Sequence, residues 1–249
     1  MKEFYVGYLP QAPPAIRRFL RLIVGLLMLA AVGSAITITA LQDPFAASVF
    51  EFGKTRTFTG TIDASPYPTL VVMRPGDATP RASHYLLVAK GKYGAEPDVS
   101  AYDRKAVRLT GTLIFREGRT LIEIQPGSLS EDKSAVPQPV AEAKDLGVFE
   151  LVGEIVDSKC HSGVMNPGEG KVHRDCAVRC LSGGIPPVFA VADFQGAPAT
   201  FVLTDRDRKL LPRTFLRLAA KPVRIRGHVV QIGDSLRLET DPASMSELP

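Results

Sequence analysis

The side chains of this sequence that bind metals most readily lie in one segment, residues 160–180. The segment contains all three cysteines of the chain and two of its four histidines, namely Cys160, His161, His173, Cys176 and Cys180. Thiolate sulfur and imidazole nitrogen are ligands that copper and zinc bind well in proteins. The segment is therefore the first candidate for a functional site, and copper or zinc is the metal that we expect there.

The spacing of these residues predicts that three of them lie on one face of a helix. Residues 171–181 favour a short helix, which two following glycines end. On that helix His173, Cys176 and Cys180 are separated by three and then four residues, so they share one face. Cys160 follows a predicted strand, and the end of this strand can bring its thiol to the same face. We expect the four side chains to form one cluster.

Three interpretations of this cluster compete. In the first, it binds one metal ion, with His161 as a spare ligand and Met165 as an additional thioether ligand for copper. In the second, Cys160 forms a disulfide with Cys176 or Cys180, which stabilises the fold by about 3 kcal/mol and leaves one inert thiol. In the third, the thiols are redox-active, although the sequence contains no C-x-x-C motif and no thioredoxin pattern.

Two resemblances concern this segment. The C-x-x-x-C spacing of Cys176 and Cys180 resembles that of Sco-type copper chaperones and of the dinuclear copper domain of cytochrome oxidase, whose thioredoxin-like and cupredoxin surroundings are absent here. Over residues 150–187, the G-E-I-V-D-x-x-C opening and the H-x-x-C-A-x-x-C helix resemble exported bacterial domains of undefined biochemistry that are associated with respiratory membrane proteins. The second resemblance implies a respiratory redox complex as the partner.

Outside the cluster, the sequence offers no pair of a nucleophile and a base. His84 and His228 lie beside or within predicted strands, where packing is their expected role. Glu154 and Asp157 are three residues apart in a predicted strand, so they face opposite sides. Phosphate-binding glycine loops and the G-x-S-x-G and H-E-x-x-H motifs are also absent. We therefore expect a binding or accessory module rather than an enzyme.

Two parts of the chain repeat one pattern of predicted strands. Residues 58–63 (FTGTID) are echoed by 151–157 (LVGEIVD), and residues 105–111 (KAVRLTG) are echoed by 221–227 (KPVRIRG). Apolar and polar residues alternate in these segments, as they do in half-buried strands. A glycine-containing first strand, a bent meander, a short helix (residues 212–220 in the second copy) and a closing hairpin resemble an OB-fold barrel.

The repeat and its flanking segments predict the domain organisation. We expect a mainly β chain in which two tandem OB-fold-like small barrels cover residues 54–128 and 147–245, with a compact β-sandwich as the alternative. Residues 129–146 form a linker that is rich in proline, serine and charged residues. The cysteine-containing insertion belongs to the second unit alone.

An apolar segment near the N-terminus predicts a membrane anchor. Residues 22–41 carry no charged side chain and are long enough to cross about 30 Å of hydrocarbon as a helix. Residues 1–21 end with three arginines, and the positive-inside rule therefore places this leader in the cytoplasm. We expect a single-pass inner-membrane protein whose bulk is periplasmic. The alternative is a signal peptide that is cleaved near residues 33–35.

Composition excludes further classes of function. The chain has 249 residues, a net charge of +4 and no tryptophan. A surface with so small a charge excess is not expected to bind nucleic acid. Three cysteines are also too few for a small scaffold stabilised by disulfides.

Overall fold

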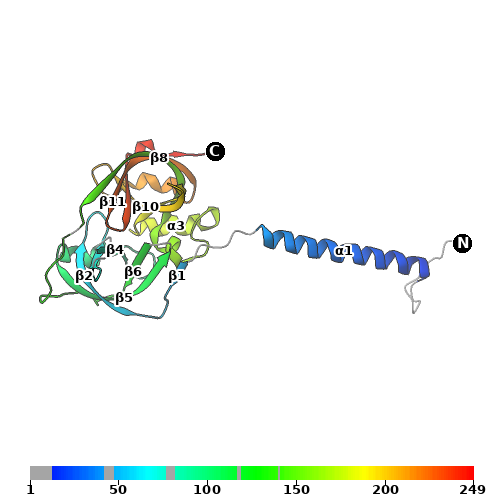
Figure 1. The fold of residues 1–249 in the computed structure, drawn as a ribbon, viewed down its shortest axis with the longest axis horizontal. Coiled ribbons are helices and arrows are strands. Elements are labelled where there is room, and N and C mark those ends of the chain that lie inside the picture. Colours follow the sequence, from blue (N-terminus) through cyan, green and yellow to red (C-terminus); the bar gives the residue numbers. More distant parts are fainter. Residues whose placement is uncertain (1–12, 42–47, 77–81, 117–118, 140) are drawn as a thin grey trace. The chain divides into compact units, whose positions relative to one another are not determined.

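The computed structural model describes residues 13–41, 48–76, 82–116, 119–139 and 141–249. Contacts between Cα atoms divide the chain into two compact units, residues 1–45 and 46–249 (Figure 1). The leader predicted over residues 1–21 lies outside the described residues up to position 12.

The first unit contains one long helix, α1 (Pro14–Ala40). It begins at a proline, whose fixed φ angle suits the first helical position. The helix starts eight residues before the predicted span because the three arginines form its first turns. Its length and apolar composition are sufficient to cross a membrane, as they are for a signal sequence. The prediction of an N-terminal apolar helix is confirmed.

The second unit begins with five strands that close into a barrel. The strands are β2 (Arg56–Asp63), β3 (Thr69–Met73), β4 (Ala82–Val88), β5 (Ala106–Arg116) and β6 (Arg119–Ile124). They pair in the order β2-β3-β4-β6-β5, and β5 also pairs with β2. Only the β4–β6 pairing among these five is parallel. The short strands β1 (Ser48–Phe50) and β7 (Ser130–Glu131) pair with β5.

Short helices and the predicted linker complete this part of the chain. Helices α2 (Glu96–Val99) and η1 (Ser100–Tyr102) connect β4 to β5. The segment predicted as a linker, residues 129–146, contains β7 and the first residues of the next long strand.

The second sheet repeats the order of pairings of the first. Its strands are β8 (Ala143–Asp157), β9 (Pro187–Phe194), β10 (Ala197–Asp205), β11 (Pro222–Ile232), β12 (Ser235–Thr240) and β13 (Ser246–Glu247). The order is β12-β10-β9-β8-β11-β13, and β11 also pairs with β12. Strands β10 and β12 run parallel, as β4 and β6 do in the first sheet.

The helices of the second sheet lie where the sequence places them. The segment between β8 and β9 contains η2 (Cys160–Val164), η3 (Lys171–His173) and α3 (Arg174–Ser182), so the helix predicted over residues 171–181 is confirmed. The helix predicted over residues 212–220 forms as the short 3-10 helix η4 (Arg213–Leu218). A further 3-10 turn, η5 (Pro242–Ser244), follows β12.

The cysteines lie in the apolar contact between the two sheets. One core cluster fills the first sheet and another fills the second. A third cluster joins Leu86 and Val88 of the first sheet to Val188 of the second, and it includes Cys160 and Cys180. Helix α3 accordingly lies between the two groups of strands (Figure 1). The site is thus buried where both parts of this unit meet.

Candidate metal centre

The turn after β8 delivers the first thiol. The Asp157 carboxylate accepts a hydrogen bond from the Cys160 backbone N–H at 2.8 Å, which fixes the turn where the strand ends. Gly168 passes so close to the Cys160 backbone that a Cβ atom at that position would overlap it. The Cys160 side chain is therefore held in place from both directions, and it is 4% exposed.

The three sulfurs converge. Cys160 Sγ lies 4.0 Å from Cys176 Sγ and 4.0 Å from Cys180 Sγ. All three Sγ atoms lie within 4.8 Å of one another. Sulfurs bound to one metal at about 2.3 Å lie about 3.8 Å apart in a tetrahedral site and about 4.0 Å apart in a trigonal site. The spacing therefore fits one metal ion. The three cysteines are free thiols, because a disulfide requires sulfurs about 2.05 Å apart.

His173 supplies a nitrogen beside this group. Its Nε2 lies 2.8 Å from Asp157 Oδ2, and both side chains are fully buried. Its Nδ1 is buried without a hydrogen-bond partner. When Nε2–H donates to the carboxylate, Nδ1 carries the lone pair that can bind a metal. Asp157, Cys160 and His173 offer ligand atoms within 4.8 Å of one another, so Cys160 belongs to both groups.

His161 points into a different polar contact. Its Nδ1 lies 3.2 Å from Glu169 Oε2 and 3.3 Å from Arg116 Nη1. The hydrogen bond with His161 lowers the pKa of Glu169. These side chains line a cavity of about 460 Å³. The structure thus brings together three of the five predicted ligands, the sulfurs of Cys160, Cys176 and Cys180, and it groups His173 with Cys160 and Asp157. His161 belongs to neither group. Met165 is exposed.

Two further residues complete the site, and the pattern of cysteines and histidines does not predict them. Asp157 lies three residues before Cys160, and this spacing is the sequence signal for the turn that its carboxylate caps. Lys92 comes from the loop between β4 and α2. Its Nζ donates to Cys176 Sγ at 2.7 Å and lies 3.7 Å from Cys180 Sγ. No local pattern links Lys92 to cysteines more than eighty residues later.

The contacts among these groups change their acidity. The hydrogen bond with Cys176 raises the pKa of Lys92, so its ammonium keeps its charge. The hydrogen bond from the Cys160 thiol lowers the pKa of Cys180, and the charge of Lys92 adds to this effect. The same hydrogen bond, together with burial, raises the pKa of Cys160. Cys180 is therefore the member of this pair that loses its proton first.

The loop that carries Lys92 is held by a close backbone contact. The Gly94 N–H donates to the Gly183 carbonyl at 3.0 Å. A Cβ atom at Gly94 would overlap the Gly184 carbonyl, and both partners are backbone. Replacing Gly94 by alanine should therefore destabilise the chain by about 1–3 kcal/mol, as overpacking does.

Thermal unfolding of the full chain in detergent measures this effect. Lys90→Ala is the matched control because Lys90 is an exposed residue of the same loop. An unchanged Tm in Gly94→Ala would show that the two backbones can separate without cost.

Comparisons with known proteins add no relative. No family model matches this chain, and none of the curated proteins or solved structures compared with it matches either.

Proposed function

We propose that this chain is a membrane-tethered periplasmic accessory module that binds one copper or zinc ion through Cys160, His173, Cys176 and Cys180. The convergence of three thiols on one point carries the proposal, because two of the sulfur separations equal 4.0 Å. The ion would serve assembly of, or contact with, a respiratory redox complex.

The surroundings of the thiols support a metal centre. His173 Nε2 lies beside the Asp157 carboxylate while its Nδ1 has no hydrogen-bond partner, which is the arrangement in which a histidine that binds a metal donates its other ring nitrogen to a carboxylate. Three thiolates leave a net negative charge on either Zn²⁺ or Cu⁺. The ammonium of Lys92, 2.7 Å from Cys176 Sγ, reduces that charge. Copper and zinc both accept such a set of sulfur and nitrogen ligands.

The architecture that carries the site is proposed to be two tandem OB-fold barrels. In each sheet the third and fifth strands of the five run parallel, and the remaining pairs of the five-strand ring are antiparallel. The metal site would then lie in an insertion between the first two strands of the second barrel. Helix α1 and the arginines before the predicted span support the membrane tether, and the resemblance of residues 150–187 supports the respiratory context.

Metal analysis of the full chain tests the proposal. The protein is purified in detergent with a reductant, stripped with a chelator, loaded with Zn²⁺ or Cu⁺ and desalted. We expect one ion per chain by elemental analysis and protection of the three thiols from a thiol reagent, which reacts with them again after the metal is removed.

The competing function, an interaction subunit with one structural disulfide, gives a different result. Protein isolated without a reductant would then contain one free thiol and no bound metal, and reloading would fail after reduction. That outcome would contradict the metal centre.

A further inference from the structure

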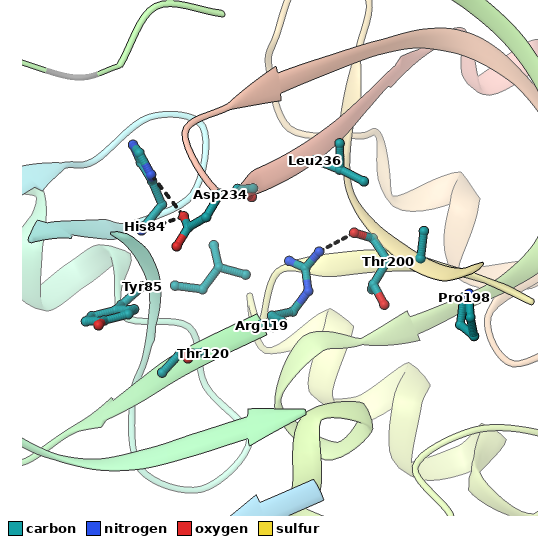
Figure 2. A pocket seen from close by; sticks show the side chains of 11 residues that line it. His84, Tyr85, Arg119, Thr120, Pro198, Thr200, Asp234 and Leu236 are labelled. Atoms are coloured by element: carbon teal, nitrogen blue, oxygen red, sulfur yellow. Dashed lines mark hydrogen bonds and ion pairs between the residues drawn. The ribbon is translucent and has the colours of Figure 1, made fainter. Parts of the chain in front are cut away.

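A second polar pocket lies between the two sheets, and none of the proposed metal ligands lines it. It has a volume of about 190 Å³ and lies between β4 and β6 of the first sheet and β10 and β12 of the second. The polar residues along its wall include His84, Arg119, Thr200 and Asp234 (Figure 2). None of them belongs to the metal centre proposed above.

Arg119 is the central cation of this pocket. Its Nη2 donates to the Thr200 carbonyl, towards which the guanidinium points in Figure 2. Its Nε is shielded from solvent and has no hydrogen-bond partner. Among the described residues, no carboxylate lies within 4.0 Å of this guanidinium. Burial also lowers the pKa of Arg119 to about 10, and the negative charge of Asp234 opposes this effect only in part.

The carboxylate nearest to this pocket, that of Asp234, already contacts two other residues. Asp234 Oδ2 lies 2.8 Å from Arg74 Nη2. Asp234 Oδ1 accepts the His84 backbone N–H at 2.9 Å and lies 3.2 Å from His84 Nδ1. One aspartate therefore faces two arginines, and the group keeps an excess of positive charge even when His84 is neutral.

We propose that this pocket binds a small oxyanion, with Arg119 as its principal ligand. Guanidinium groups bind phosphate and carboxylate oxygens through charge-assisted hydrogen bonds, and among the described residues no carboxylate within 4.0 Å competes for the guanidinium of Arg119. The volume is below the roughly 300–1,000 Å³ of pockets for larger organic ligands, so phosphate, sulfate or a short carboxylate is the size class that fits. Because strands from both sheets line the pocket, the anion would also hold the two sheets together.

Inorganic phosphate is the probe for the test. The full chain in detergent is titrated with phosphate by calorimetry at constant ionic strength, and Tm is followed in parallel. We expect one saturable site per chain and a Tm that rises with phosphate and then levels off. Arg119→Lys keeps the charge but loses the planar set of guanidinium N–H donors, and it should bind phosphate at least about tenfold more weakly.

Two further variants keep the test decisive. Arg56→Lys is the matched control because Arg56 is an exposed arginine of the same sheet, and its phosphate affinity should equal that of the wild type. Ala199→Val narrows the pocket on β10 without removing a charge, and it should also weaken phosphate binding. If the wild type shows no saturable binding, or if phosphate binds Arg119→Lys and Ala199→Val as tightly as the wild type, the proposal is overturned.

Discussion

Replacing Cys160 by serine is expected to weaken metal binding by about two orders of magnitude. Cys160 is the residue that the two groups of ligand atoms share, and its sulfur lies 4.0 Å from both other sulfurs. Structural zinc sites with four ligands bind with about 10–16 kcal/mol, or roughly 3 kcal/mol per ligand. Loss of about 3 kcal/mol corresponds to about a hundredfold rise in Kd. Competition with a chromophoric chelator measures this Kd on the full chain.

A control from the same turn separates ligand loss from misfolding. Ser162 is buried, and its hydroxyl has no hydrogen-bond partner. Ser162→Ala therefore removes an oxygen at similar depth without removing a contact, and its metal affinity and Tm should match those of the wild type. A Cys160→Ser variant that binds zinc within threefold of the wild type would show that this sulfur is not a ligand.

The cysteine cluster could be predicted because its geometry is mostly local. The helical period alone predicts that His173, Cys176 and Cys180 share one face of a helix. That helix forms as η3 and α3, and it places Cys176 and Cys180 beside Cys160. The β-rich class followed from alternating apolar residues in the same way. Such periodic patterns predict structure because burial of one face of a helix or strand produces them.

The remaining parts of the site depend on contacts that no local pattern encodes. Lys92 reaches Cys176 because its loop packs against the turn after α3, which is a contact between the two sheets. The His161 ring lies beside Arg116 at the end of β5, whose Nη1 is 3.3 Å from His161 Nδ1 and donates to the His161 carbonyl at 3.0 Å. His161 is therefore next to Cys160 in the sequence, but its side chain contacts Arg116 of the first sheet.

A buried lysine, Lys159, also lies in the contact between the two sheets. Its replacement should destabilise the chain strongly. Its side chain is 3% exposed, and its Nζ lies 2.5 Å from Glu123 Oε2. The ammonium also donates to the carbonyls of Ala89 and Gly91 at 2.9 and 2.7 Å. Lysine has three N–H donors, and these three acceptors use all of them. Lys159 thus follows β8 of the second sheet, whereas Glu123 lies in β6 of the first sheet and the two carbonyls lie in the loop after β4.

Lys159→Met is expected to lower the free energy of unfolding by about 3–5 kcal/mol. Methionine can occupy a similar volume, but it leaves Glu123 as an uncompensated, largely buried charge, and this is the costly way to break a buried ion pair. In a unit of this size, about 3 kcal/mol corresponds to a fall in Tm of roughly 6–12 °C. Thermal unfolding of the full chain in detergent measures the change.

A second substitution shows whether the unpaired Glu123 carboxylate causes the loss of stability. Lys159→Met combined with Glu123→Gln removes the unpaired charge and should recover part of the lost stability, while the two carbonyls still lack their donor. Lys171→Met is the control, because Lys171 is an exposed lysine of the same insertion, and its free energy of unfolding should stay within about 0.5 kcal/mol of the wild type. If the double variant is as unstable as Lys159→Met, the loop carbonyls of residues 89 and 91 account for the loss. Because Lys92 lies in that same loop, weaker metal binding in Lys159→Met would then show that the contact between the sheets positions the metal centre.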